Sequence, residues 1–224
     1  IMQNFFLSIK KFILSSRHDK PHGIFLLFYP CLWGLCLTNK NILEVYYLCI
    51  IFFLGSLGMR AVGCIWNDIT DKKLDILVHR TKKRLIATGQ TSKSEAIIFI
   101  LINLTLGIIP LFFISKFSII LCLAVIPLVI TYPYMKRITW WPQLWLGINF
   151  NWGILVSYYT LERLSLNVSI LLFYIGSIFL TIAYDTIYGF QDIKDDIKLG
   201  IKSTAIKFSE KPKQFLIINY LCCF

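Results

Sequence analysis

The chain has few charged residues for its length. Only 16% of its 224 residues are charged, whereas 57% are hydrophobic and the mean hydropathy is +0.68. Soluble domains typically carry about 25% charged and about 45–50% apolar residues. A soluble chain of this size could not bury so much apolar surface, so we expect the protein to lie in membrane lipid.

Metal-binding patterns built on cysteine or histidine are also missing. None of the seven cysteines forms a C-x-x-C pair, and the three histidines, His18, His22 and His79, lack metal-ligand spacing. Most cysteines lie in apolar runs, where Cys behaves as a small hydrophobe. The sequence therefore argues against a zinc site or a disulfide framework.

Acidic residues are scarce as well. Twelve Asp and Glu stand against 23 Lys and Arg, which gives a net charge of +11. A basic balance can indicate nucleic-acid binding, but these charges lie between apolar blocks. Anionic lipid headgroups and membrane topology explain them better, and we expect no nucleic-acid partner.

Apolar runs separated by short polar segments predict an all-α fold, a polytopic bundle of transmembrane helices. Most runs approach the roughly 20 residues that cross a bilayer, and backbone groups in lipid must be bonded within the segment. The residues before Asp19 contain no acid and predict an interfacial helix. The runs lie near 22–38, 42–66, 96–114, 117–135, 142–160 and 166–190, and a further run begins near 215.

Lysine and arginine are unevenly distributed about these runs. With a cytoplasmic N-terminus, 19 of the 23 fall on the inner side, three (Lys40, Lys116 and Arg163) fall on the outer side, and Arg60 lies within a span. Such a bias is the positive-inside signal. It predicts that segments 67–93, 136–141 and 191–213 lie on one side of the membrane.

Two clusters of acidic residues follow predicted spans. Within each cluster the carboxylates recur at helical spacing on one face, where they repel each other unless a cation lies between them. Oxygen ligands suit Mg²⁺, which typically takes one or two carboxylates plus substrate phosphates. A solvated loop with ordinary charges is the alternative, and the recurrence on one side makes it the weaker reading. The first cluster is Asn67, Asp68, Asp71 and Asp75, and the second is Asp192, Asp195 and Asp196.

Basic and aromatic residues stand close to both clusters. Carboxylates for a metal combined with bases for phosphate oxygens suit a diphosphate, although positive-inside anchoring explains some of the lysines. Arg60 is different, because a charge inside a span is expensive and indicates a role in an internal cavity. Aromatic rings beside the acids can stabilise a carbocation. The bases are Arg80, Lys82, Lys83, Arg84, Lys198 and Lys202, the rings are Trp66, Tyr184 and Tyr188, and Tyr132 and Lys136 share a face near the end of a third span.

The motifs resemble the UbiA superfamily of intramembrane prenyltransferases over about residues 17 to 215. Residues 60–75 are similar to the first aspartate motif of that family with its leading Arg, and residues 184–196 with 200–205 are similar to the second. The segments that resemble the 4-hydroxybenzoate polyprenyltransferase branch are 19–23, 132–137, 141–147 and 150–153.

The resemblance implies a nine-helix fold with a central cavity open to lipid. This chain holds about six and a half of those helices, so we expect one transmembrane prenyltransferase domain over 1–224 that is truncated at its C-terminus. The implied reaction transfers a polyprenyl group from a polyprenyl diphosphate to the ring of 4-hydroxybenzoate, in ubiquinone synthesis, with Mg²⁺ as cofactor. The expected location is a bacterial inner membrane or, as the alternative, the mitochondrial inner membrane.

The resemblance also implies roles for individual residues. The six aspartates of the two clusters bind Mg²⁺ and diphosphate, and Asp185 takes up a proton. Arg60 and Tyr132 position the aromatic acid, and Tyr188 lies by the substrate. The phosphates are contacted by Asn67, Arg80, Lys82, Lys136 and Lys202.

Three other functions compete with this one. A family member with a haem, chlorophyll or other quinone-precursor acceptor would lack the 132–153 features, and a cation-coupled transporter would place its charges near the bilayer midplane. A CDP-alcohol phosphotransferase needs glycines between its acids, which Asp71-Lys72-Lys73-Leu74-Asp75 lacks. Lys83 and Leu85 replace the Asn and Pro that usually follow the first cluster in the family, and an inactive truncated remnant is a further possibility.

Overall fold

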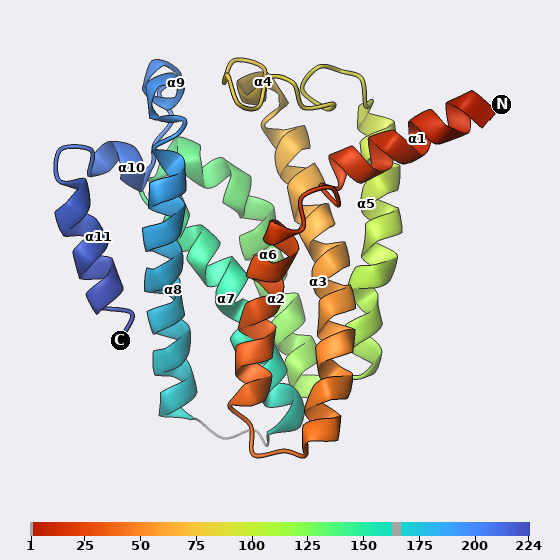
Figure 1. The fold of residues 1–224 in the computed structure, drawn as a ribbon, viewed down its shortest axis with the longest axis vertical. Coiled ribbons are helices and arrows are strands. Elements are labelled where there is room, and N and C mark those ends of the chain that lie inside the picture. The colour runs from red at the N-terminus through yellow and green to blue at the C-terminus, as the bar shows by residue number, and fades with distance from the viewer. Residues whose placement is uncertain (1, 163–166) are drawn as a thin grey trace. The chain divides into compact units, whose positions relative to one another are not determined.

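A computed structural model describes residues 2–162 and 167–224, and this part of the chain is all-helical, as the sequence predicts (Figure 1). Arg163, counted above on the outer side, lies outside the described residues. The helices are α1 (Met2–Ser15), α2 (His22–Cys36), α3 (Ile42–Thr70), α4 (Lys72–Asp75), α5 (Lys93–Ile108), the 3₁₀ turn η1 (Ile109–Phe112), α6 (Lys116–Ile138), α7 (Pro142–Leu161), α8 (Val168–Gly189), α9 (Ile193–Lys198), α10 (Thr204–Lys207) and α11 (Pro212–Leu221).

Four helices are long and apolar enough to cross a membrane by length and composition. They are α3, α5 with η1, α6 and α8. The predicted first span forms α2, an apolar helix of 15 residues, and the predicted fifth span forms α7, whose 20 residues include Gln143, Asn149 and Asn151. Every predicted span is therefore a helix, and α7 is too polar to satisfy the same criterion because it buries amides.

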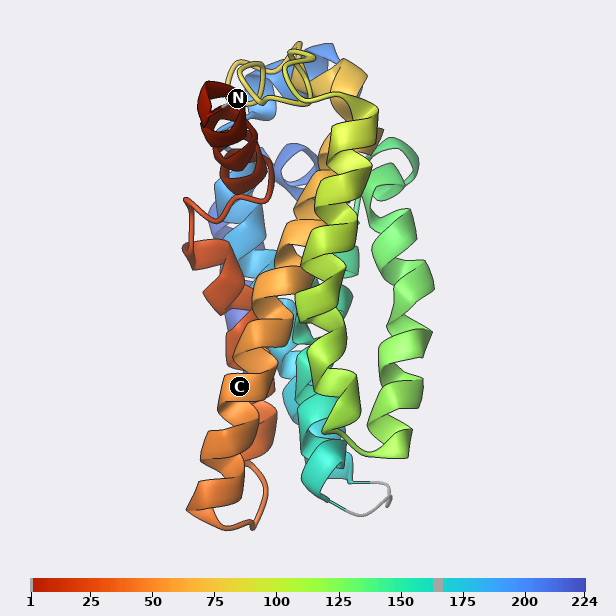
Figure 2. The same cartoon turned by 90° about the vertical axis from the view of Figure 1, so that its right-hand side faces the viewer.

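The chain forms two compact units, and each is described by itself. Unit 1 comprises residues 1–29 and 41–113, and unit 2 comprises residues 30–40 and 114–224. In unit 1, α3 and α5 lie side by side along their lengths (Figures 1 and 2). Gly58 allows the close approach, because an added Cβ would lie within 2.6 Å of the Gly107 backbone nitrogen.

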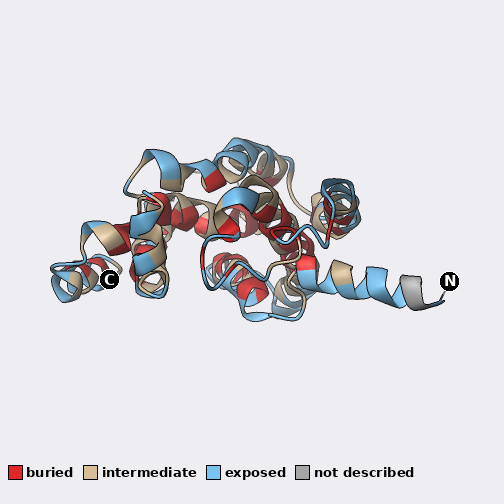
Figure 3. Ribbon diagram, turned by 90° about the horizontal axis from the view of Figure 1, so that it is seen from above, coloured by how far each residue is buried: buried red, intermediate tan, exposed pale blue. Residues whose placement is uncertain are grey.

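The apolar contacts of unit 1 gather near the end of α3. Ile65, Ile86, Ala96 and Phe99 form a buried cluster, and Phe12 of α1 packs against it. The predicted interfacial helix is present as α1, which is exposed along most of its described length (Figure 3). This packing holds the N-terminal segment beside the end of α3, where the first acidic cluster begins.

In unit 2, α7 packs against both α6 and α8. Ile154, Leu155, Tyr158 and Tyr159 of α7 form a buried core. Asn151 is 3% exposed, and the two N–H groups of its Nδ2 are shared among three acceptors, Gly147 O, Ser177 O and Thr181 Oγ1. The amide is thereby satisfied inside the helix packing, as a polar group in lipid requires.

The end of α6 lies beside the segment that follows α9. Lys202 donates from its backbone nitrogen to Lys136 O (2.8 Å) and from Nζ to Ile138 O (3.0 Å). Lys207 Nζ lies 4.9 Å from the centroid of the Trp141 ring. Segments 136–141 and 191–213, which the charge pattern predicts on one side of the membrane, therefore lie at one end of unit 2.

Candidate functional site

The first acidic cluster lies where the longest helix ends. α3 runs for 29 residues from an Asn41 cap to Thr70, Asp71 follows as its C-terminal cap, and α4 ends at Asp75. The three carboxylates are buried, with residue exposures of 4% for Asp68, 0% for Asp71 and 5% for Asp75. Buried carboxylates need opposite charge or hydrogen bonds nearby, so their surroundings decide what they can do.

One arginine joins two of these carboxylates. Nη1 of Arg84 donates to Oδ1 of Asp68 (3.0 Å) and to Oδ2 of Asp75 (2.7 Å). The loop that brings Arg84 back is fixed by Thr81, whose Oγ1 donates to Asp75 O (2.8 Å). A cation between the carboxylates is what their spacing predicts, and here that cation is a guanidinium.

A second arginine reaches the same site from the N-terminal segment. Nη2 of Arg17 donates to Oδ1 of Asp68 and forms an ion pair with it. Burial by itself lowers the pKa of Arg17, but the surrounding negative charges, of which Asp68 is the largest, together outweigh burial and the pKa is raised. Arg17 therefore meets Asp68 as a cation.

The spacing of the acidic clusters does not single out Arg17, and it makes Arg84 only one base among several. Fifty-one residues separate Arg17 from Asp68. The sequence does hold one signal for Arg17. It stands two residues before segment 19–23, which resembles the family. Helical spacing cannot reveal such a pair, because the two residues are brought together by tertiary packing.

The donors suit Mg²⁺ by their chemistry. Carboxylate and amide oxygens are hard ligands of the kind this ion takes, and it usually completes its shell with water and substrate phosphates. Within the described residues, no three His, Cys, Asp or Glu side chains come close enough to hold a metal by themselves. The first cluster therefore offers oxygen ligands that suit such an ion, without surrounding it by itself.

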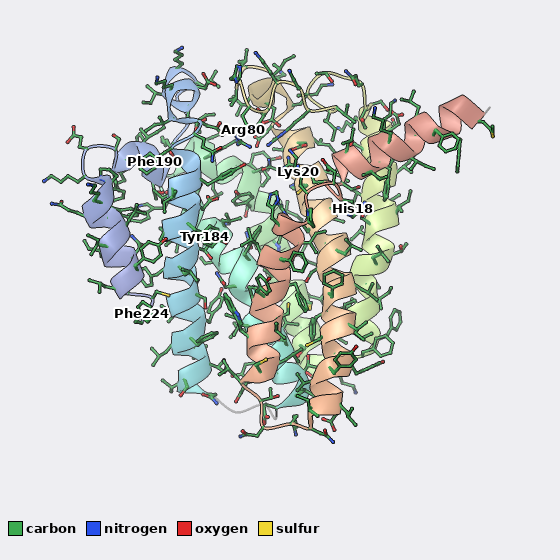
Figure 4. All side chains as sticks on the ribbon, in the orientation of Figure 1. His18, Lys20, Arg80, Tyr184, Phe190 and Phe224 are labelled. Atoms are coloured by element: carbon green, nitrogen blue, oxygen red, sulfur yellow. The ribbon has the colours of Figure 1, made fainter. Side chains whose placement is uncertain are left out.

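The other predicted residues of unit 1 lie on α3 and in the loop after α4. Arg60 of α3 packs against Gly23 of α2, where an added Cβ would lie 2.5 Å from Nε. Asn67 O accepts the backbone hydrogen bond of Asp71 (2.8 Å). Arg80 and Lys82 are exposed in the loop after α4, and Figure 4 shows Arg80 there.

In unit 2 the second acidic cluster follows α8. Asp192 precedes α9, and Asp195 and Asp196 occupy its first turn, with all three half-buried. The backbone nitrogen of Asp196 donates to Asp192 O (2.9 Å), so these two residues lie one helical turn apart. Asp185 is half-buried near the end of the same helix, α8.

The remaining predicted residues lie on α8 and at the end of α6. Tyr188 is 48% exposed on α8, and Tyr184, one turn earlier, is half-buried on the same helix (Figure 4). Tyr132 and Lys136 are half-buried on α6. Lys136 and Lys202 are brought together through the backbone hydrogen bond described above.

Two curated proteins of similar sequence carry the same name. The chain is 40% identical over 218 residues to the mitochondrial 4-hydroxybenzoate polyprenyltransferase of Drosophila pseudoobscura pseudoobscura. The matched region covers 96% of this chain and 55% of that protein. The chain is 39% identical over 210 residues to the protein of the same name from Homo sapiens, covering 93% and 56%. The chain therefore spans about half the length of the curated relatives it matches.

Solved structures share the fold at lower identity. The apo UbiA homolog from Aeropyrum pernix K1 superposes with a TM-score of 0.74 at 22% identity, covering 90% of this chain and 75% of that one. A UbiA homolog from Archaeoglobus fulgidus bound to GPP and Mg²⁺ gives a TM-score of 0.69 at 19% identity, covering 95% and 73%. The model of the UbiA prenyltransferase family matches residues 27–224. On this match, which takes in both acidic clusters, the chain belongs to the UbiA prenyltransferase family.

Proposed function

We propose that this chain transfers a polyprenyl group from a polyprenyl diphosphate to the ring carbon ortho to the hydroxyl of 4-hydroxybenzoate. The observation that carries the proposal is the buried Asp68–Arg84–Asp75 arrangement at the end of a span, in a chain 40% identical to proteins named for this reaction. Paired acids and bases at a helix end suit the headgroup of a lipid-like diphosphate.

The diphosphate is assigned to the two acidic clusters and their bases. The Asp residues of both clusters would hold Mg²⁺ together with the diphosphate, and the charge pattern predicts that both clusters lie on one side of the membrane. When bound, Mg²⁺ neutralises the charge that develops on the leaving diphosphate. The direct phosphate contacts are assigned to Asn67, Arg80, Lys82, Lys136 and Lys202.

The aromatic acceptor is assigned to Arg60 and Tyr132. Arg60 would pair with the carboxylate of 4-hydroxybenzoate. A charged side chain within a span is costly and usually has a functional role. The allylic carbon–oxygen bond breaks, the ring forms the new carbon–carbon bond, and the ring proton passes to the diphosphate or to Asp185. Rings such as Tyr188 line the path of the cation and exclude water from it.

The positions of the acids support this function over a cation-coupled transporter. Asp68 lies two residues before the end of α3, and the second cluster follows the end of α8. Transporters keep their coupling carboxylates near the middle of broken helices. Acids at helix ends suit a headgroup, whose hydrocarbon chain lies in the membrane.

For location we propose the mitochondrial inner membrane. Both relatives described above are named as mitochondrial proteins. These names support the mitochondrial alternative over the bacterial inner membrane that was the first expectation from the sequence. A hydrocarbon donor explains in physical terms why the reaction takes place in a membrane.

The direct test is a prenylation assay. The full chain is reconstituted in liposomes with radiolabelled 4-hydroxybenzoate, a polyprenyl diphosphate and Mg²⁺. We expect a prenylated product that disappears with EDTA and falls roughly 10²–10³-fold in Asp71→Asn and in Asp192→Asn, because each removes a charge that acts on the diphosphate. Glu210→Gln, an exposed acid outside both clusters, is the matched control and keeps full activity.

Two results would contradict the proposal. One is the absence of product from a chain shown to be folded and inserted. The other is product formation that neither EDTA nor the two Asp→Asn substitutions reduce.

A further inference from the structure

The C-terminal end of α1 holds an unusual residue. Arg17 has a φ of 55°, and among the described residues it is the sole non-glycine with a positive φ. The backbone nitrogen of His18 donates to Ile13 O (3.1 Å) and that of Arg17 to Leu14 O (3.3 Å). These two bonds are the Schellman pattern, in which glycine usually takes the left-handed position.

A buried polar cluster fixes the residues on both sides of Arg17. Asn103 of α5 is fully buried and donates through Nδ2 to Ser16 Oγ (2.9 Å) and to Phe99 O (2.8 Å). Its Oδ1 lies 3.1 Å from Nε2 of His18, which Figure 4 shows in the connection between α1 and α2. Because Nδ2 of Asn103 is already a donor, Nε2 of His18 donates to Oδ1.

Two more contacts extend this anchor along the N-terminal segment. The Ser15 and Thr91 hydroxyls lie 3.3 Å apart in buried surroundings. Lys11 Nζ forms an ion pair with Glu95 (3.0 Å) at the start of α5. Residues of α5, together with Thr91 just before it, therefore contact the N-terminal segment on both sides of Arg17.

A structural role alone does not explain arginine at this position. A tight turn after a helix is satisfied by glycine without strain, and a left-handed non-glycine residue persists only where its surroundings impose it. What arginine adds is the contact of its guanidinium with Asp68. Asn103 is itself a fully buried amide in a helix apolar enough to span a membrane, where such groups are usually retained for a role.

We propose that Arg17 is a positioning residue for the first acidic cluster, and that the Ser16–Asn103–His18 hydrogen bonds hold it in place. Arg17 acts through Asp68: it fixes the carboxylate and leaves Arg84 to bridge Asp68 and Asp75. This inference rests on the proposed binding of a metal and a diphosphate at the cluster, and it adds a control over that site by residues of α5 and of the N-terminal segment.

The test measures metal binding separately from turnover. Mn²⁺ is titrated into the full chain in lipid nanodiscs, with inorganic pyrophosphate present, and free Mn²⁺ is followed by electron paramagnetic resonance. Substitutions of residues that orient metal ligands commonly weaken affinity by roughly 10–100-fold, and we expect a loss in that range in both Arg17→Gly and Asn103→Leu. Arg17→Lys, which keeps the charge, is expected to recover part of the affinity.

Asn151→Leu is the matched control. Asn151 is also a buried amide with three hydrogen bonds, but it belongs to unit 2 and has no bond to the N-terminal segment. It should lose thermal stability to the same extent as Asn103→Leu and keep its Mn²⁺ affinity. An equal loss of Mn²⁺ affinity in the control would show a general effect of unfolding and overturn the proposal.

The remaining outcomes separate this inference from the proposed function. If the unmodified chain binds Mn²⁺ and neither Arg17→Gly nor Asn103→Leu weakens it, the positioning role is wrong whatever the enzyme makes. If the chain binds no Mn²⁺, the inference is overturned because there is no site to position. If the variants weaken Mn²⁺ binding while the unmodified chain makes no prenylated product, the inference stands and the prenyl transfer does not.

Discussion

At the scale of single residues, the site is a balance of buried charges. Asp68, Asp71 and Asp75 are almost completely removed from solvent, and Arg17 and Arg84 lie against two of them. A buried ion pair adds little net stability, but removing one partner leaves a charge that nothing compensates. The two arginines therefore offset the negative charge that Asp68 and Asp75 bring into this buried site.

Arg84→Met is the residue-scale test of this balance. It removes the guanidinium from Asp68 and Asp75 and keeps a long apolar side chain in its place. We expect a loss of about 3–5 kcal/mol in the free energy of unfolding, measured by denaturation in detergent micelles. Lys83→Met changes the adjacent exposed base and should leave stability nearly unchanged.

A double substitution checks the cause of that loss. In the Arg84→Met background Asp68 keeps its ion pair with Arg17, whereas Asp75 has lost its ion pair with Arg84, so Asp75→Asn should recover part of the stability. Additive losses in the double variant would show that the carboxylates do not depend on Arg84.

Gly23 carries a second residue-scale prediction. An added Cβ would lie 2.5 Å from Nε and 2.9 Å from Nη2 of Arg60, so Gly23→Ala must displace the flexible end of that side chain. If Arg60 positions the aromatic acid, the KM for 4-hydroxybenzoate rises in Gly23→Ala. The KM for the polyprenyl diphosphate is the internal control and stays constant, and a parallel rise in both constants would contradict the role given to Arg60.

At the scale of helices, small residues decide how closely neighbours pack. In a membrane, burial of apolar surface does not drive helices together, so close contact through glycine contributes instead. In unit 2, Gly153 of α7 faces Cys31 of α2: an added Cβ would lie 2.5 Å from Sγ and 3.3 Å from the backbone nitrogen. The crossing of these two helices has no room for a methyl group.

Gly153→Ala tests the tightness of this crossing. We expect a loss of about 1–3 kcal/mol, the usual range for overpacking, although alanine favours a helix more than glycine does. The change in thermal midpoint in detergent is the measurement. Cys31→Ala in the same background removes the Sγ atom and should restore most of the loss, and no restoration would place the strain elsewhere.

At the scale of the whole molecule, charge and apolar length govern how the chain lies in the membrane. The lysines and arginines predict that both acidic clusters share one side of the bilayer. Within unit 2, the hydrogen bonds of Lys202 with Lys136 O and Ile138 O bring segments 136–141 and 191–213 together, and the side taken by the first cluster stays a prediction. A shared side is a condition for two clusters to hold one diphosphate.

Labelling of introduced cysteines tests the topology. With all seven native cysteines replaced by Ser or Ala, single cysteines are introduced at the exposed positions Lys83, Lys194 and Lys116. A membrane-impermeant maleimide applied to one side of sealed membranes should label the first two together and Lys116→Cys from the opposite side. Labelling of Lys83→Cys and Lys194→Cys from opposite sides would exclude a shared site.

Much of the fold could be predicted from local sequence. The lengths of the apolar runs predict every span, and because backbone groups in lipid must be hydrogen-bonded within the segment, each span is predicted to be a helix. The helix α11 begins near the predicted position 215. The number of compact units could not be predicted, because it depends on which helices pack together. The structure describes two compact units. The single domain over 1–224 and the central cavity that the sequence predicts stay predictions.

In the candidate site, too, contacts set by local spacing could be predicted and contacts set by tertiary packing could not. Asp68 and Asp75 could be grouped because seven residues of helix bring side chains back to one face. Arg17 could not, because its contact with Asp68 requires a left-handed turn, a buried amide on α5 and the packing of α1 against the end of α3. By itself the sequence determined the membrane setting, the helices and the family motifs, since these follow from composition and short-range spacing. Only the tertiary structure decided which cations compensate the buried carboxylates, because that choice is made by atoms distant along the chain.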